Sequence, residues 1–167
     1  NAICKGFEEL HEIGLVDDVS NLKVTAAQPH GCAPIVDAFK KNTSEIVPVE
    51  RPDTIAKSLA IGDPGDGVYV LRRLKQYGGI AEEANDNEIV EGIMTLAKTE
   101  GIFTEPAGGV SIAVLKKLVD DGFIEQDEKV VCYVTGNGLK SIEAIMGALP
   151  KLDVVKPDVQ TVSAMIS

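Results

Sequence analysis

The stretch Leu22-Lys-Val-Thr-Ala-Ala27 is short, largely apolar and partly β-branched, which is typical of a strand buried in a sheet. It follows residues 2–13, in which apolar side chains recur at helical spacing until Gly14 ends the pattern. A helix followed by a buried strand forms one αβ unit. The stretch therefore predicts an α/β fold.

The alternation of helical and strand-like patterns continues along the chain. Lys129-Val-Val-Cys-Tyr-Val134 is apolar, β-rich and too short for a helix, which is typical of a central parallel strand covered on both faces. We therefore expect a layered parallel sheet with helices on both faces. A further strand is expected at 79–83, and helical segments are expected at 33–41, 54–59, 66–76, 86–99, 110–121 and 139–148.

Length and composition fit one domain. The chain has 167 residues, of which 44 % are hydrophobic, and this is enough to bury a core without disulfides. We expect residues 1–149 to form the α/β domain and residues 150–167 to form an extended or partly disordered tail. The chain opens without Met on a helical pattern, so we expect it to be part of a longer protein.

Charge and hydropathy exclude two classes of partner. The formal charge of -10 would repel a phosphate backbone, so nucleic acid is not expected as a partner. No apolar run approaches the roughly 20 residues that span a bilayer, so no membrane is expected either. Cys4, Cys32 and Cys132 lie far apart, which predicts reduced, buried thiols and a cytoplasmic protein.

Thr135-Gly-Asn-Gly138 is the first candidate site. It follows the predicted strand 129–134, and ligands of open parallel sheets collect beyond the carboxyl ends of the strands. Its glycines would let the backbone approach a flat ligand, while the Thr135 hydroxyl and the Asn137 amide can form hydrogen bonds. Gly and Asn are also common turn residues, so an ordinary turn is the alternative.

Glu105-Pro-Ala-Gly-Gly109 is the second candidate site. A carboxylate before a rigid Pro and a Gly pair, at the start of a helix, is well placed to face a pocket. The alternative is that Glu105 only complements the helix dipole. Asp63 and Asp66 lie in a third, glycine-rich loop, where solvated turn aspartates are more common than metal ligands, so no metal site is expected.

Together these motifs carry a family resemblance. Gly101-Ile-Phe-Thr-Glu-Pro-Ala-Gly-Gly109, followed by Lys129-Val-Val-Cys-Tyr-Val-Thr-Gly-Asn-Gly-Leu-Lys140, closely resembles the threonine synthases, which are pyridoxal-phosphate (PLP) enzymes of fold type II. The opening Asn1-Ala-Ile-Cys-Lys-Gly-Phe7 resembles the helix that follows the cofactor-phosphate loop of this family. Ala60-Ile-Gly-Asp-Pro64 resembles its Ile-Gly-Asn-Pro segment. The resemblance implies the large carboxy-terminal domain of that fold.

The resemblance also implies a reaction and a cofactor. The cofactor would be pyridoxal 5'-phosphate, the substrates O-phosphohomoserine and water, and the products threonine and phosphate. Family members are commonly homodimers, so the intact enzyme is expected to be one. The resemblance also implies roles for single residues. Thr135 would lie at the pyridine nitrogen of the cofactor, and Gly136 and Asn137 would line the same side of the cofactor site. Glu105 and Ala107 would lie near the cofactor edge, and Asp63 would belong to a candidate substrate loop.

One departure from the family pattern matters. The Schiff-base lysine of this fold lies in a Ser-Phe-Lys-Asp-Arg-like segment, and no lysine of this chain has such surroundings. We therefore assign no catalytic residue here and expect the lysine and the phosphate loop upstream of residue 1. The chain alone is expected to be inactive.

Two other assignments stay open. Threonine dehydratase and cysteine synthase share the Glu-Pro-Ala-Gly-like and glycine-loop features, although Thr-Gly-Asn-Gly-Leu-Lys favours threonine synthase. A noncatalytic α/β domain that binds a small metabolite through the same loops is the alternative of a different class.

Overall fold

A two-stranded parallel sheet forms the centre of the protein. The computed structural model describes residues 1–149 and 154–166. Strands β1 (Thr25–Pro29) and β2 (Ile80–Ala84) pair in parallel, with Thr25 opposite Ile80. Parallel strands need a long crossover, and here it contains α2 (Pro34–Lys40), the 3-10 turn η2 (Lys57–Leu59) and α3 (Gly67–Gln76).

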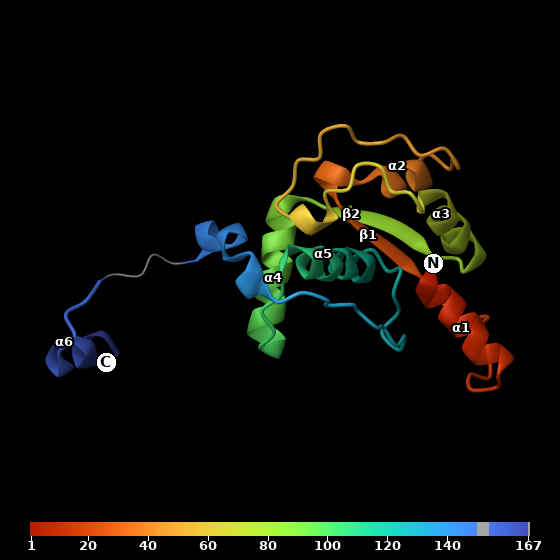
Figure 1. The fold of residues 1–167 in the computed structure, drawn as a ribbon. Helices are drawn as coiled ribbons and strands as arrows, with labels where there is room; N and C mark the ends of the chain where they lie inside the picture. Colours follow the sequence, from red (N-terminus) through yellow and green to blue (C-terminus); the bar gives the residue numbers. More distant parts are fainter. Residues whose placement is uncertain (150–153, 167) are drawn as a thin grey trace.

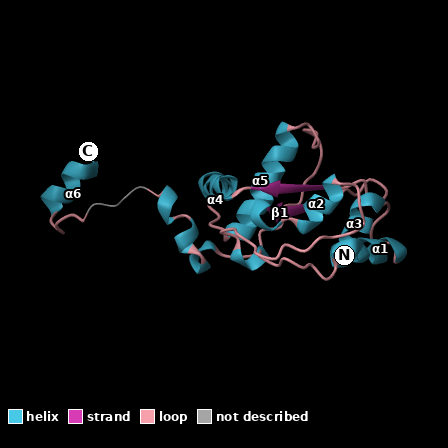
Figure 2. Cartoon of the chain, turned by 90° about the horizontal axis from the view of Figure 1, so that it is seen from above, coloured by secondary structure: helices cyan, strands magenta, loops and turns pink. Residues whose placement is uncertain are grey.

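Helices cover both faces of this sheet, as expected. Helices α2 and α3 lie on one face, and α5 (Pro106–Asp120) lies on the other with α4 (Asp86–Glu100) packed against it (Figure 1). Figure 2 shows the two strands from above, between these helices. Successive strand residues point to opposite faces, so Ala81 packs with α2 and α3 while Ala84 packs with α4 and α5.

Each face has its own apolar cluster. The cluster of α2 and α3 comprises Ala33, Ile35, Val36, Ala38, Leu71, Leu74 and Ala81. The cluster of α4 and α5 comprises Ala56, Ala84, Ile89, Ile93, Val110, Ala113, Val114, Leu118 and Ile145.

Capping residues set the bounds of α4. The Asn85 side chain accepts a hydrogen bond from the Glu88 N–H, and the Glu88 carboxylate accepts one from the Asn85 N–H, which together form a capping box. The N-cap is therefore Asn85, and the helix starts at Asp86. At the other end, Gly101 adopts a left-handed conformation with φ 68°, which favours glycine.

Helix α1 (Ala2–Glu12) is attached to α3 mainly through Glu8. The Glu8 carboxylate accepts hydrogen bonds from Arg73, from Tyr77 at 2.8 Å and from Gln76 at 3.1 Å. The bonds from Arg73 and Tyr77 lower the pKa of Glu8 below its ordinary value. One ionised side chain thus holds two helices together.

The expected strand at 129–134 is wrong. This segment is extended along α5 but pairs with no strand among the described residues, and Val131 is 77 % exposed (Figure 1). A β-rich sequence becomes a strand only beside a neighbour that accepts its hydrogen bonds. The described sheet consists of β1 and β2, and neither pairs with this segment.

The expected helix at 139–148 is also wrong. The chain forms three 3-10 turns instead: η3 (Gly138–Lys140), η4 (Ile142–Ala144) and η5 (Met146–Ala148). Of the apolar residues Ile142, Ile145 and Met146, only Ile145 is buried. A short helix needs a buried apolar face to be stable, and this segment does not have one.

The last described element is α6 (Val159–Ile166), which Figure 1 shows apart from the α/β body. It lies within the expected tail, 150–167, of which residues 150–153 and 167 are outside the described residues. The domain boundary at 149 stays a prediction. Throughout the described ranges, no helix has the length and apolar character needed to cross a membrane.

Candidate functional site

The two candidate loops meet at the start of α5. Thr104 and Asn137 form an antiparallel β-bridge. The Glu105 N–H donates to the Gly136 carbonyl at 3.0 Å, and the Gly138 N–H donates to the Phe103 carbonyl at 2.9 Å. Residues 103–105 and 136–138, which are distant in sequence, therefore form a short ladder.

Thr104 holds this ladder from inside. Its side chain is buried, and its hydroxyl lies 3.2 Å from the Gly136 carbonyl and 3.2 Å from the Glu105 carbonyl. A Cβ at Gly108 would lie 1.9 Å from the Thr104 Oγ1, so only glycine fits there. Thr104 was not among the site residues predicted from the sequence, where its position next to Glu105 is the signal for it.

The Glu105 carboxylate faces the glycine loop. Glu105 is 9 % exposed and occupies the N-cap position of α5, but its side chain makes no capping hydrogen bond. Its Oε2 forms an ion pair with the Lys140 Nζ at 3.0 Å, and Lys140 itself is largely exposed. This geometry favours a role toward the loop over a role limited to the helix dipole.

Gly136 and Gly138 of the loop lie directly against side chains of the segment that precedes α5. A Cβ at Gly136 would lie 1.8 Å from the Glu105 Oε1, and a Cβ at Gly138 would lie 2.6 Å from the Phe103 ring. Both glycines thus permit close packing against the segment that precedes α5. Phe103 and Lys140 are further contact residues that the motif analysis missed.

The remaining residues predicted to contact the cofactor are Thr135 and Asn137, which present polar groups to solvent, and Ala107. Thr135 is exposed, and within 1–149 and 154–166 its hydroxyl has no hydrogen-bond partner. Asn137 is also exposed, and its Oδ1 accepts a hydrogen bond from the Leu139 N–H at 2.9 Å. Ala107 is half-buried in the first turn of α5, next to Glu105.

Asp63 does not join this group. It is exposed in the loop between η2 and α3, beside Gly62, whose carbonyl accepts a hydrogen bond from the Val49 N–H at 3.0 Å. The neighbouring Asp66 accepts a hydrogen bond from Asn1. In the part of the chain that the structure describes, no three acidic, His or Cys side chains come together to hold a metal ion.

Sequence comparison places the chain among enzymes that use pyridoxal phosphate. The family model described as "Pyridoxal-phosphate dependent enzyme" matches residues 1–136. A threonine synthase of Methanocaldococcus jannaschii is 45 % identical over 148 residues, which are 89 % of this chain and 36 % of the relative. One of Methanosarcina acetivorans is 38 % identical over 99 % of this chain and 40 % of the relative. The chain thus spans about two fifths of their length.

Solved structures show the same fold. A maize serine racemase superposes with a TM-score of 0.59 at 16 % identity, over 83 % of this chain and 42 % of that chain. A fungal L-serine ammonia-lyase from Rhizomucor miehei superposes with a TM-score of 0.61 at 18 % identity, over 81 % and 42 %. The family match over most of the sequence and the agreement in fold lead to one conclusion: this chain belongs to the family of pyridoxal-phosphate dependent enzymes.

Proposed function

We propose that the protein to which this chain belongs is a threonine synthase, which converts O-phosphohomoserine and water to threonine and phosphate. The observation that carries the proposal is the ladder between residues 103–105 and 136–138, because it joins the two motifs on which the resemblance rests. The identity of 45 % to the Methanocaldococcus jannaschii threonine synthase supports the reaction.

The chemistry of the exposed groups fits one edge of the cofactor. Thr135 offers a hydroxyl with no partner among the described residues, and such a group can donate to a ring nitrogen. Asn137 offers its amide beside it, since only its oxygen is used by Leu139. Gly136 leaves room for the Glu105 carboxylate behind them. These residues would hold the pyridine edge of pyridoxal phosphate.

The bound cofactor would supply an electron sink for the reacting carbons of the substrate. Thr135 would position the ring through a neutral hydrogen bond that adds no charge at the ring nitrogen. Glu105 would keep the glycine loop in place through Lys140, and Ala107 would provide a small side chain at the cofactor edge. Asp63, in its exposed loop, is proposed to contact substrate.

Two further properties of the intact protein belong to this proposal. Cys4, Cys32 and Cys132 are free thiols, which supports a cytoplasmic location. Burial raises the pKa of Cys32 and of Cys132, which keeps both groups in the thiol form. A homodimer stays a prediction, and light scattering of the intact protein would test it.

The experiment uses a chimera in which this chain replaces the 148 aligned residues of the Methanocaldococcus jannaschii threonine synthase. Thr135→Ala in the chimera should weaken the binding of pyridoxal phosphate about fivefold to tenfold, the worth of one hydrogen bond, and should lower turnover. Thr135→Ser keeps the hydroxyl and should restore both values. Equal cofactor affinity in all three proteins would reject the assignment of Thr135.

A further inference from the structure

Asn137 is the one asparagine of this chain that is followed directly by glycine. In such a pair, the backbone nitrogen of the glycine can attack the side-chain amide carbon of the asparagine, because glycine carries no side chain that hinders the approach. The attack closes a succinimide ring and expels ammonia. Every other asparagine of the chain is followed by a residue with a side chain. Asn137 is therefore the asparagine whose sequence most favours deamidation.

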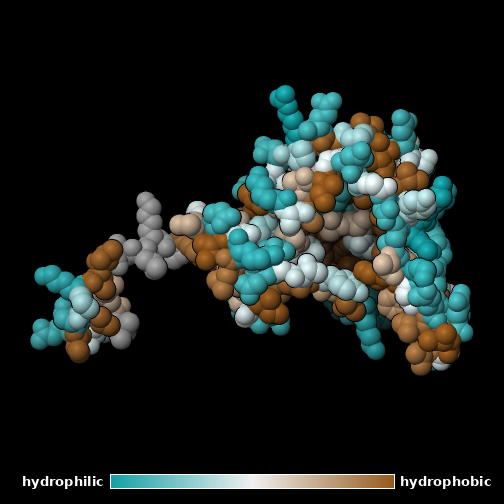
Figure 3. Space-filling view, in the orientation of Figure 1, coloured by the Kyte–Doolittle hydropathy of each residue, from teal (hydrophilic) through white to brown (hydrophobic). Residues whose placement is uncertain are grey.

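The surroundings of the Asn137 side chain suit this reaction. Asn137 is exposed, and the segment that leads to it passes below α5 (Figure 1), where the same face in Figure 3 shows polar and pale surface atoms. The Asn137 Oδ1 accepts a hydrogen bond from the Leu139 N–H at 2.9 Å, and this N–H would stabilise the negative charge that develops on the oxygen during the attack. Within residues 1–149 and 154–166, nothing accepts a hydrogen bond from the Asn137 Nδ2, so this nitrogen is free to leave.

A hydrogen bond of the ladder restrains the attacking nitrogen. The Gly138 N–H donates to the Phe103 carbonyl at 2.9 Å, and Gly138 is buried against the Phe103 ring. The Gly138 nitrogen must leave this bond before it can lose its proton and attack. A short ladder at the surface can open locally while the rest of the chain stays folded. Opening of the ladder is therefore the step that limits the reaction.

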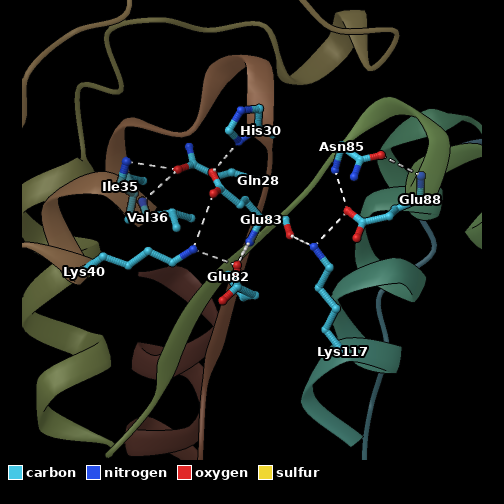
Figure 4. A network of polar contacts seen from close by, with 10 residues as sticks. All are labelled: Gln28, His30, Ile35, Val36, Lys40, Glu82, Glu83, Asn85, Glu88 and Lys117. Carbon is cyan, nitrogen blue, oxygen red and sulfur yellow. Dashed lines mark hydrogen bonds and ion pairs between the residues drawn. The ribbon is translucent and has the colours of Figure 1, made fainter. Parts of the chain in front are cut away.

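Asn85 provides a contrast within the same chain. It is also exposed, but a capping box holds it in place (Figure 4). Its Oδ1 accepts from the Glu88 N–H at 3.0 Å, and its N–H donates to the Glu88 carboxylate at 2.7 Å. The next residue, Asp86, has a side chain and begins α4. Exposure alone thus does not distinguish the two asparagines, whereas the residue that follows each of them does.

We propose that Asn137 is a site of spontaneous deamidation, and that the ladder between residues 103–105 and 136–138 controls its rate. When the ladder is open, a bond forms between the Gly138 nitrogen and the Asn137 Cγ, and the bond between Cγ and Nδ2 breaks. The proton of the Gly138 N–H passes through solvent to the leaving nitrogen, which departs as ammonia. Water then opens the ring to aspartate or isoaspartate, without any oxidation or reduction. This proposal does not rest on the reaction proposed above.

The modification weakens the ladder that restrained it. Both products place a new carboxylate directly after Gly136, against which the Glu105 carboxylate packs, and like charges repel. Isoaspartate also lengthens the backbone by one methylene at the residue that pairs with Thr104. Residues 136–138 of the modified chain therefore pair less well with residues 103–105.

Peptide mapping by mass spectrometry tests the proposal on this chain, which is kept folded in mildly alkaline buffer and sampled over time. The tryptic peptide of residues 130–140 contains Asn137, and that of residues 76–98 contains Asn85 and Asn87. The first peptide should gain the mass of deamidation, partly as isoaspartate, and the second should not. Asn137→Gln should abolish the gain, because its longer side chain closes a ring poorly. An unmodified first peptide, or an equal gain in both peptides, would overturn the assignment of Asn137.

A matched pair of threonine variants tests the control by the ladder. Thr104→Val removes the hydroxyl that lies 3.2 Å from the Gly136 carbonyl. It should speed deamidation of Asn137 about fivefold to tenfold, the worth of one hydrogen bond. Thr54→Val removes a buried hydroxyl that donates to Asp86, outside the ladder, and should leave the rate unchanged. Equal acceleration by both variants would mean that the reaction requires unfolding of the whole chain, which would overturn the control by the ladder.

Discussion

Gly109→Ala should destabilise the protein, because α4 and α5 cross at this glycine. A Cβ at Gly109 would lie 2.6 Å from the Ile89 carbonyl oxygen and 2.7 Å from the Ile93 Cγ1. Neither group can move freely, since Ile89 and Ile93 are fully buried in the cluster of α4 and α5. The helices would have to separate to admit one methyl group.

The expected magnitude is the balance of two effects. Overpacking of a core costs about 1–3 kcal/mol, and a contact with rigid backbone belongs at the upper end. Against this, alanine in place of glycine inside a helix stabilises the folded protein by about 1 kcal/mol. The net loss of about 2 kcal/mol corresponds to a fall in the thermal midpoint of roughly 4–8 °C for a chain of this size.

The assay is thermal unfolding followed by circular dichroism, with Gly6→Ala as the matched control. Gly6 is also helical, in α1, but a Cβ there would meet nothing within 4 Å. The control should therefore raise the midpoint by about 2–4 °C, from helix propensity alone. A midpoint for Gly109→Ala at or above that of the unmodified chain would refute the tight crossing of α4 and α5.

Three further predictions concern polar contacts. Glu8→Ala should release α1 from α3 and so speed tryptic cleavage before residue 15, which mass spectrometry measures. Glu12→Ala, at an exposed site, should not change the cleavage rate. Equal rates for the two variants would contradict the role of Glu8. Thr54→Val should lower the free energy of unfolding, measured with urea, by about 1–3 kcal/mol. The reason is that the buried hydroxyl donates to Asp86 at 2.9 Å and accepts from the Ala56 N–H at 3.1 Å. A loss below about 0.5 kcal/mol would argue against this pair of hydrogen bonds. Stability should fall as the pH drops below about 4.5. Burial raises the pKa of Glu82 and of Glu88, but the hydrogen bonds to the two carboxylates have the larger combined effect, so both pKa values are lowered in the folded protein. Folding therefore favours the ionised carboxylates, and this contribution is lost when acid protonates them. The double variant Glu82→Gln, Glu88→Gln should flatten this dependence, and an unchanged pH profile would refute it.

Local sequence patterns predicted most of the helices correctly. Helices α1, α3 and α4 were expected within one or two residues of their observed bounds, because apolar spacing and capping residues act within a few turns. The apolar pattern of α5 was visible only from Val110, although the helix starts at Pro106. Proline fits the first turn of a helix, and this position signals a start that the apolar spacing did not reveal.

Both wrong predictions concern segments whose structure depends on contacts with distant parts of the chain. Residues 129–134 have the composition of a strand, but a strand also needs a neighbour, and the sequence of the segment does not specify one. Residues 139–148 have apolar residues at helical spacing, but only Ile145 finds a core to contact. Burial of an apolar face depends on tertiary structure, which spacing alone does not contain.

The candidate site was predicted in part. Glu105 and the loop 135–138 were predicted from the sequence, and the structure joins them through the Thr104–Asn137 bridge. The ion pair between Lys140 and Glu105 was not predicted, because an exposed lysine after a turn has no distinctive local pattern. Asp63 was grouped with the site by resemblance, and the described structure leaves it in a separate loop.

The most direct test of the proposed function is product analysis of the chimera supplied with pyridoxal phosphate and O-phosphohomoserine. We expect threonine and inorganic phosphate to form in equal amounts, and both to disappear when the cofactor is withheld. Release of ammonia in place of phosphate, or a folded chimera that binds the cofactor and forms no threonine, would contradict the proposal that this chain comes from a threonine synthase.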